Sequence, residues 1–224
     1  RKMEVVQADG LYVRPDEVGE FQIAVAETYD VVVTPGDGAY SLIAESSDRS
    51  GMARATLAPR AGMTAPVPPL RQRPLATMQD MGMTMDGGGT DHAAMGHGGE
   101  TIKHSMRDMS LAPTVKDTPT VQSISPTPAD RTGDPGQGLE GEPDVLTYRD
   151  LVALDRNPDT RTPARQMQIH LTGNMERYMW AFDGVKMNEV KAPIPFTEGE
   201  RVRVTLVNDT MMTHPIHLHG MWSD

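Results

Sequence analysis

Three histidines lie within six residues near the end of the sequence, in the run His-Pro-Ile-His-Leu-His-Gly from 214 to 220. In an extended strand, side chains two residues apart share a face and side chains three residues apart do not. His217 and His219 are therefore expected to project together, about 6 to 7 Å apart by the strand rise, whereas His214 points elsewhere. Pro215 removes a backbone donor and fixes the local turn. This parity predicts that the segment serves two metal centres.

The residue types of this segment favour copper as the bound metal. Imidazole suits copper, zinc, iron and nickel, and among divalent ions nitrogen sites bind Cu(II) most tightly. Two alternatives are open: three surface histidines without a ligand role, and a zinc site built on His217 and His219 with a distant third ligand. The chain has 17 methionines among 224 residues and no cysteine. A thioether excess without thiols favours copper and an oxidising compartment.

A second group of possible metal ligands lies between residues 78 and 109, where methionine and histidine alternate with glycine and aspartate. Its members are Met78, Met81, Met83, Met85, His92, Met95, His97, His104, Met106 and Met109. Glycines interrupt any helix here, and between Thr77 and Thr101 the only other apolar side chains are two alanines. Because thioethers select Cu(I) and imidazoles also hold Cu(II), the composition predicts copper capture rather than core packing.

Other histidine and tryptophan residues have simpler interpretations. His170 shares strand parity with Gln166 and Gln168, which predicts a solvated face rather than a ligand. Trp180 and Trp222 are expected to be core residues rather than electron relays.

The elements that must position these residues are predicted to be strands in two separate regions. Residues 1–58 show period-two patterns, at 21–25, 29–33 and 40–44, and are interpreted as the end of a β-sandwich with too few strands to close two sheets. Residues 59–143 lack periodicity and are predicted to be a flexible linker rich in Pro, Gly, Met and His. Residues 144–165 are expected to hold a short helix capped by Asp144, followed by a connection. Residues 166–224 begin a second β region.

Composition excludes several classes of protein. The net charge of −10 lacks the basic patch that nucleic-acid binding requires. No apolar run is long enough to cross a membrane, and no signal peptide is visible. Without cysteine, disulfides, zinc ribbons and thiol catalysis are excluded within these residues.

The segment 214–220 resembles the His-Pro-x-His-Leu-His-Gly element that opens the copper-ligand set of the last cupredoxin domain in multicopper oxidases. Other segments are similar to the CopA-type copper-resistance oxidases. They are the runs at 25–33 (Val-Ala-Glu-Thr-Tyr-Asp-Val-Val-Val), 48–51 (Asp-Arg-Ser-Gly), 146–148 (Leu-Thr-Tyr), 177–185 (Arg-Tyr-Met-Trp-Ala-Phe-Asp-Gly-Val) and 207–214 (Val-Asn-Asp-Thr-Met-Met-Thr-His). The resemblance covers both β regions and the expected helix; the linker shares only its composition.

This resemblance implies an all-β fold class, with two incomplete cupredoxin-like Greek-key β-sandwich domains joined by the linker. Residues 1–58 would end one domain, and 166–224 would begin the last one. His214 would be a ligand of the type 1 copper, His217 of the type 2 copper and His219 of the type 3 pair. Met212 would guide Cu(I) toward the type 1 site, with packing as the alternative role.

The function implied by the resemblance is that of a periplasmic multicopper oxidase for copper resistance, which oxidises Cu(I), and in some cases phenols, while reducing O₂ to water. Its partners would be copper ions, O₂ and periplasmic copper-resistance proteins. The family also needs two His-x-His pairs from its first domain and a His-Cys-His segment from the end of its last domain. None of these is present in this sequence, so the chain alone is expected to be catalytically incompetent. The alternatives are a non-catalytic copper-sequestering protein, or a zinc hydrolase that would be colourless.

Overall fold

The computed structural model describes residues 2–77, 80, 106–220 and 223. The chain divides into two compact units. The first unit contains residues 1–75, 130–158 and 215–224, and the second contains residues 76–129 and 159–214. Each unit therefore combines segments that are far apart in the sequence.

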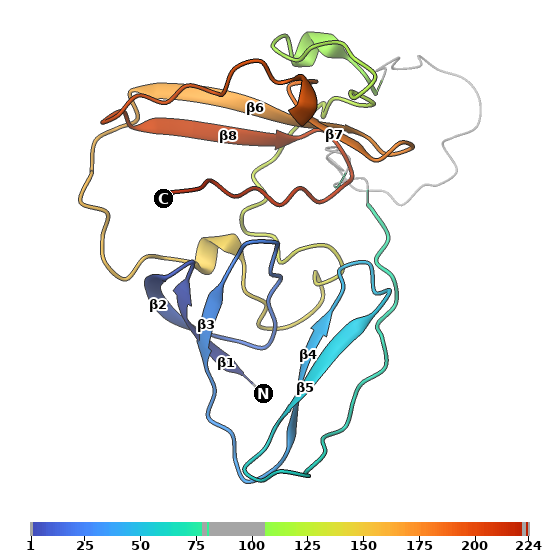
Figure 1. The fold of residues 1–224 in the computed structure, drawn as a ribbon, viewed down its shortest axis with the longest axis vertical. Coiled ribbons are helices and arrows are strands. Elements are labelled where there is room, and N and C mark those ends of the chain that lie inside the picture. Colours follow the sequence, from blue (N-terminus) through green and yellow to red (C-terminus); the bar gives the residue numbers. More distant parts are fainter. Residues whose placement is uncertain (1, 78–79, 81–105, 221–222, 224) are drawn as a thin grey trace, which may run out of the picture. The chain divides into compact units, whose positions relative to one another are not determined.

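The first unit contains a three-stranded antiparallel sheet in the order β2-β1-β3 (Figure 1). Its strands are β1 (Met3–Ala8), β2 (Leu11–Val18) and β3 (Tyr29–Val32). Asp9 and Gly10 join β1 to β2 with φ angles of 49° and 80°, as a two-residue hairpin turn requires. A separate hairpin pairs β4 (Tyr40–Glu45) with β5 (Met52–Leu57). The strands predicted near 29–33 and 40–44 are thereby confirmed.

The strand predicted at residues 21–25 is wrong, because a turn occupies this position. Ala26 has a φ of 70°, and the Glu27 carboxylate accepts a hydrogen bond of 2.6 Å from the backbone N–H of Ala24. Val25 is consequently 81% exposed. Phe21 instead packs edge-on against Tyr29, with ring centroids 5.1 Å apart, at the border of a core that contains Val5, Val13, Val18 and Leu146.

The helix expected from Asp144 is also wrong, because the backbone of this segment hydrogen-bonds to β2 and its flank. Gly19 N–H donates to the Asp144 carbonyl at 2.7 Å, and Arg14 N–H donates to the Val152 carbonyl at 2.8 Å. Bonds to a neighbouring strand leave these groups unavailable for a helical ladder. Only one 3₁₀ turn, η3 (Tyr148–Asp150), forms here.

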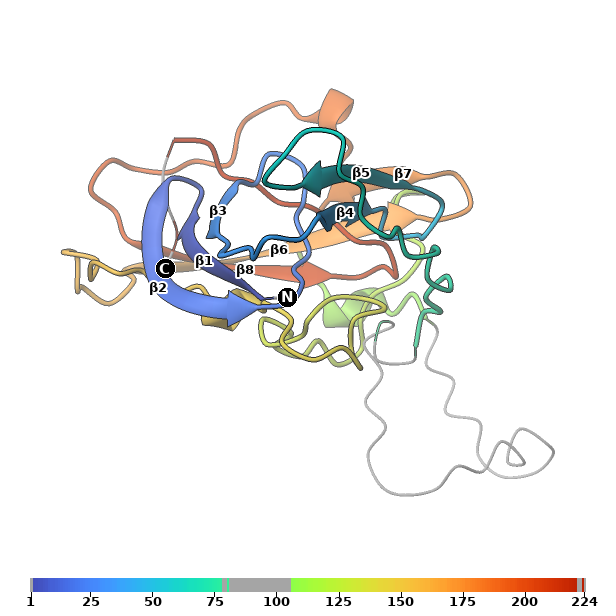
Figure 2. The ribbon, with the colours of Figure 1, turned by 90° about the horizontal axis from the view of Figure 1, so that it is seen from below.

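The second unit is built on a mixed sheet in the order β7-β6-β8 (Figure 2). Its strands are β6 (Arg165–Asn174), β7 (Met179–Phe182) and β8 (Val202–Asn208). Strand β7 pairs antiparallel with β6, and β8 runs parallel to β6 with His170 opposite Val207. The 3₁₀ turn η4 (Met187–Glu189) lies in the connection from β7 to β8. The period-two pattern that predicted strands at 166–171 and 201–206 is confirmed.

Residues 106–129 pack on this sheet, although they belong to the region predicted to be a flexible linker. Ala112, Val115, Val121 and Ile124 form a buried cluster after the 3₁₀ turn η2 (Met109–Leu111). Their segment is tied to the β6–β7 pair, since Lys116 N–H donates to the Asp183 carbonyl at 2.9 Å. These buried residues are three or six positions apart, which does not match the strand period of two, so the search for alternation did not reveal this core.

Other described parts of the expected linker contact the first unit. Arg71, in the Pro-rich run after β5, donates to both carboxylate oxygens of Glu20 and to Glu45. Leu139 is buried, with 5% of its surface exposed. The described segments on either side of 81–105 are therefore anchored by specific contacts.

The all-β fold class is confirmed. Within the described ranges, every regular element longer than three residues is a strand, in sheets consistent with cupredoxin-like β-sandwich domains. No helix in those ranges has both the length and the apolar character that crossing a membrane would require.

Candidate metal centre

The turn that follows β8 is built by side chains rather than by a regular element. Asn208 Oδ1 accepts hydrogen bonds from the backbone N–H and the hydroxyl of Thr210, both at 2.9 Å. The Asn208 side-chain amide donates to the Met212 carbonyl at 2.8 Å. Asparagine favours such turns because its short side chain can replace backbone partners. The strand thus ends at a closed turn that carries the chain to His214.

Thr210 is buried and links this turn to the His214 ring. Its Oγ1 accepts the Met212 N–H at 3.0 Å and lies 2.8 Å from His214 Nε2. The hydroxyl can donate to Asn208 Oδ1 at 2.9 Å or to the Met212 carbonyl at 3.4 Å. With its single hydrogen directed to either of these oxygens, Oγ1 is an acceptor toward the Met212 N–H and His214 Nε2. The hydrogen-bond network therefore assigns the ring hydrogen of His214 to Nε2, which leaves the Nδ1 lone pair for another partner.

His214 lies in a half-buried position that suits a metal ligand. Burial lowers the pKa of His214, which favours the neutral imidazole that metals require. In the described part of the chain, its only hydrogen bond is the one at Nε2. The Trp180 ring lies beside it, with centroids 5.8 Å apart. The donor chemistry of His214 thus fits a metal bound at Nδ1, with the other nitrogen held by a second residue.

Met212 is held in place from two sides. The Trp180 indole N–H donates to the Met212 sulfur, with Nε1 and Sδ 3.2 Å apart. The Met212 methyl lies over Gly173 of β6, where an added Cβ would come within 2.5 Å of Cε. These contacts support a packing role for Met212. Its sulfur also lies next to Trp180, which contacts the His214 ring.

His170 does not lie on a solvated face, and that prediction is wrong. It is 4% exposed, and its Nδ1 lies 2.6 Å from Oδ2 of the buried Asp209. The Gln168 amide lies 2.9 Å from His170 Nε2, so each ring nitrogen has a partner. Burial raises the pKa of Asp209, although hydrogen bonds from Ser125 and His170 act in the opposite direction. Parity correctly grouped His170 with Gln168, but residues 121–125 cover this face of the sheet.

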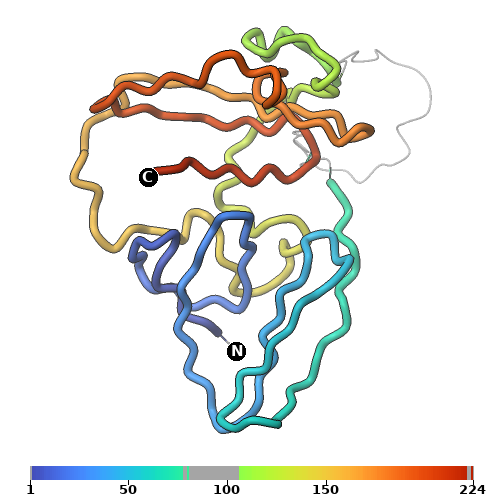
Figure 3. The backbone as a smooth tube through the Cα atoms, viewed as in Figure 1, coloured from blue at the N-terminus to red at the C-terminus, as the bar shows by residue number. Residues whose placement is uncertain are grey.

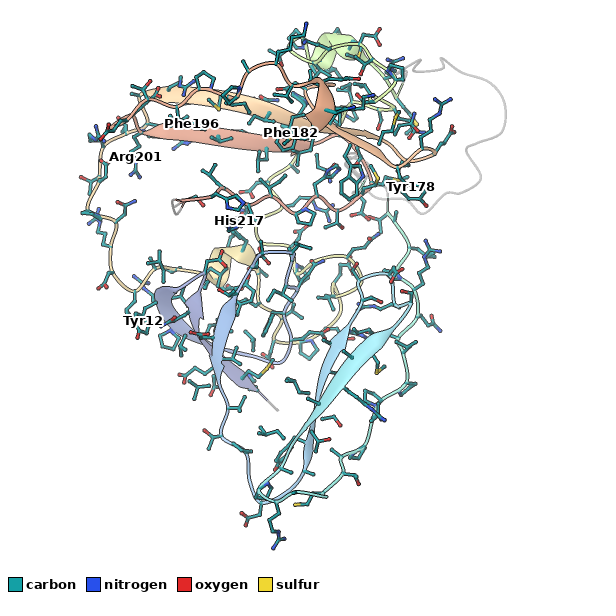
Figure 4. All side chains as sticks on the ribbon, in the orientation of Figure 1. Tyr12, Tyr178, Phe182, Phe196, Arg201 and His217 are labelled. Atoms are coloured by element: carbon teal, nitrogen blue, oxygen red, sulfur yellow. The ribbon has the colours of Figure 1, made fainter. Side chains whose placement is uncertain are left out.

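The rings of His217 and His219 lie together as predicted, although their segment is not the strand on which that prediction was based. Their rings meet edge to face, with centroids 4.9 Å apart and planes at 89°. Both residues are exposed on an irregular C-terminal segment of the first unit, where Figure 4 labels His217 and Figure 3 traces the backbone. Two adjacent imidazoles offer a pair of nitrogen donors. Nowhere among the described residues do three or more His, Cys, Asp or Glu side chains gather into one possible metal site.

Most of the methionine-rich group cannot be placed. The residues of this group that lie outside the described ranges are Met78, Met81, Met83, Met85, His92, Met95, His97 and His104. Met106 is described and is 59% exposed. Met109 packs against the buried cluster around Ala112, which supports a core role for this one residue.

Sequence reasoning missed Thr210 and misjudged Trp180. Trp180 is 55% exposed rather than a core residue, and Trp222 lies outside the described ranges. The Asn-x-Thr spacing at 208–210 could have predicted the turn. The contacts of Trp180 with Met212 and His214 have no local signal, because they join residues more than 30 positions apart.

Comparison with known proteins finds similarity to the same family at both ends of the chain. Two family models, each described as "Multicopper oxidase", match residues 160–224 and residues 1–62. Across its whole length the chain is 48% identical to the copper resistance protein A homolog of Pseudomonas syringae pv. tomato and 45% identical to the copper resistance protein A of Escherichia coli. It is 25% identical, over 97% of its length, to the multicopper oxidase MmcO of Mycobacterium tuberculosis.

The chain spans 41% and 43% of the first two relatives and 30% of the third. No solved structure matches it.

Proposed function

We propose, because this chain belongs to the multicopper oxidase family, that the protein containing it is a periplasmic copper-resistance oxidase that oxidises Cu(I) at the expense of O₂. The relatives named copper resistance protein A support copper as the element handled. The observation that carries the proposal is His214: a half-buried imidazole, held at Nε2 by Thr210, directly before the exposed pair His217 and His219.

We assign the copper ligands as the resemblance implies. His214 would hold the type 1 copper, His217 the type 2 copper and His219 one ion of the type 3 pair, with the remaining ligands supplied by sequence outside this chain. Bound copper would supply one-electron oxidation of a donor and four-electron reduction of O₂ to water. Thr210 would hold Nε2 of His214 and so orient its ring toward the metal.

Cu(I) is the proposed reducing substrate, with phenols as a second class of donor. Met212 offers a soft thioether next to Trp180, which also contacts His214. The methionine-rich segment from 78 to 109 offers further thioethers, which select Cu(I) over harder ions. We propose that this segment collects Cu(I) and that Met212 is the last thioether before the type 1 site.

The deciding experiment uses the complete protein that contains this chain, folded in copper-replete medium. Copper content and the visible absorption of a type 1 centre are measured for the wild type, for His214→Ala and for the neighbouring exposed control Thr213→Ala. We expect the wild type and the control to be blue and His214→Ala to lose the band, with less than one hundredth of the Cu(I) oxidation rate.

Other outcomes would contradict the proposal. Copper bound without a visible band and without O₂ consumption would support a sequestering protein instead. A colourless protein whose activity is restored by zinc would support a hydrolase.

A further inference from the structure

Trp180 is a large aromatic residue whose position is not explained by core packing. It lies on β7 and is 55% exposed, yet it makes two specific contacts with the turn that follows β8. The indole N–H donates to the Met212 sulfur, and the ring lies against His214. Trp180 thus links a thioether to an imidazole that we propose as a metal ligand.

The Met212 methyl occupies a space that exists because residue 173 of β6 is glycine. Gly173 of β6 lies directly opposite Trp180 of β7 in the antiparallel register. A Cβ at this position would approach Met212 Cε to 2.5 Å, the Met179 carbonyl to 3.0 Å and Thr210 Cγ2 to 3.1 Å. Glycine thus leaves a space that the Met212 methyl fills, while Trp180 covers the sulfur.

The hydrogen bond from the Trp180 indole leaves the Met212 sulfur able to bind a soft cation. A thioether has two lone pairs; the indole N–H takes one of them and leaves the other for a soft cation. Methionine is otherwise among the most adaptable side chains, with three rotatable bonds. Anchoring the methyl over Gly173 and the sulfur under Trp180 removes most of this freedom before a metal ion arrives, which lowers the cost of binding.

From these contacts we propose that Trp180 is a positioning residue that determines specificity for a soft monovalent metal substrate, because it holds the Met212 thioether ready beside His214. This inference rests on the proposed function and adds a residue to it. Trp180 acts through Met212 and donates no ligand atom. Donors that do not use a thioether, such as phenols, do not depend on it.

The test uses the complete, copper-loaded protein and a double-mutant cycle of Trp180→Phe and Met212→Leu. Trp180→Phe keeps an aromatic ring but removes the N–H. Because a single hydrogen bond is lost, we expect KM for Cu(I) to rise about three- to tenfold, with kcat and the phenol reaction unchanged. The double variant should be no worse than Met212→Leu alone. Met187→Leu, an 89% exposed methionine in η4, is the matched control.

A second readout uses the copper-free protein and Ag(I) as a redox-inert probe. The Trp180 contribution to the fluorescence is the difference in emission between the wild type and Trp180→Phe. Ag(I) should quench the Trp180 emission when Met212 is present. The quenching that occurs at the lowest Ag(I) concentrations should disappear in Met212→Leu.

Additive effects in the cycle, an unchanged KM for Cu(I) in Trp180→Phe, or quenching that survives Met212→Leu would each overturn the inference. A slower phenol reaction at saturation in Trp180→Phe would also overturn it and identify an electron relay. A wild-type protein without the blue band would instead refute the proposed function itself.

Discussion

At the scale of single residues, the candidate site depends on one hydroxyl group. Thr210 Oγ1 is bonded to Asn208, Met212 and His214 at distances between 2.8 and 3.0 Å. The same atom closes the turn and fixes the tautomer of the imidazole. Thr210 therefore decides which His214 nitrogen would be available to a metal in the proposed type 1 site.

Thr210→Val tests this role, because valine has nearly the same shape but no hydroxyl. The Met212 N–H and His214 Nε2 would lose their partner, so we expect a loss of about 1 to 3 kcal/mol in the free energy of unfolding. Copper affinity at the type 1 site should fall about ten- to a hundredfold. Urea denaturation and copper competition on the complete protein measure these effects. Thr213→Val, which is exposed, is the control, and an equal loss there would argue against a specific role for Thr210.

At the scale of elements, a buried polar pair joins three segments of the second unit. His170 lies on β6, and Asp209 follows β8 directly. Asp209 also accepts the Ser125 N–H at 2.8 Å, from the segment that was expected to be linker. Asp183 faces the same region and accepts the backbone N–H of His170. The pair therefore connects the turn before His214 to both the sheet and the segment that covers the sheet.

The pair predicts a pH dependence of stability. Because burial raises the pKa of Asp209, the folded state holds this proton more tightly than the unfolded state does. The stability that this bound proton gives to the folded state is fully present below the ordinary aspartate pKa. It is lost as the pH rises through the raised pKa of Asp209.

Asp209→Asn keeps the hydrogen-bonding shape but cannot titrate, so its stability relative to the wild type should increase with rising pH. Asp209→Ala leaves the Ser125 N–H and the His170 ring without their partner, so the free energy of unfolding should fall by about 1 to 3 kcal/mol. Urea midpoints measured across the acidic range check both expectations, and parallel pH profiles of the wild type and Asp209→Asn would contradict them.

At the scale of the whole molecule, the chain contributes to two compact units whose cores use segments from distant parts of the sequence. The region from 81 to 105 lies between parts of the second unit and outside the described ranges. Its composition has too few apolar side chains for a core of its own, so we assign it to metal capture rather than to folding.

Replacing residues 81–105 by a Gly/Ser segment of equal length tests this division of roles. Met106 and Met109 stay in place, because Met109 packs in the core of the second unit. Because soft ions bind thioethers, we expect the replaced protein to lose several bound Ag(I) ions in isothermal titration. Its visible band and unfolding midpoint should be retained. Unchanged silver stoichiometry would remove the capture role, and a lowered midpoint would show a folding role instead.

The sequence by itself determined the features that depend on local order. The spacing of His217 and His219 predicts that their rings lie together, alternation identifies β6 and β8, and the residue types at 214–220 predict copper ligands. These follow from backbone geometry and ligand chemistry, which neighbouring residues set.

Only the tertiary structure decided which side chains surround His214 and which face of β6 is buried. Trp180, Met212 and Gly173 meet because β7 and the turn after β8 flank the same end of β6. His170 is buried because residues 121–125, which have no periodic pattern, cover its face of the sheet. Burial and contact depend on segments distant in sequence, so no local pattern encodes them.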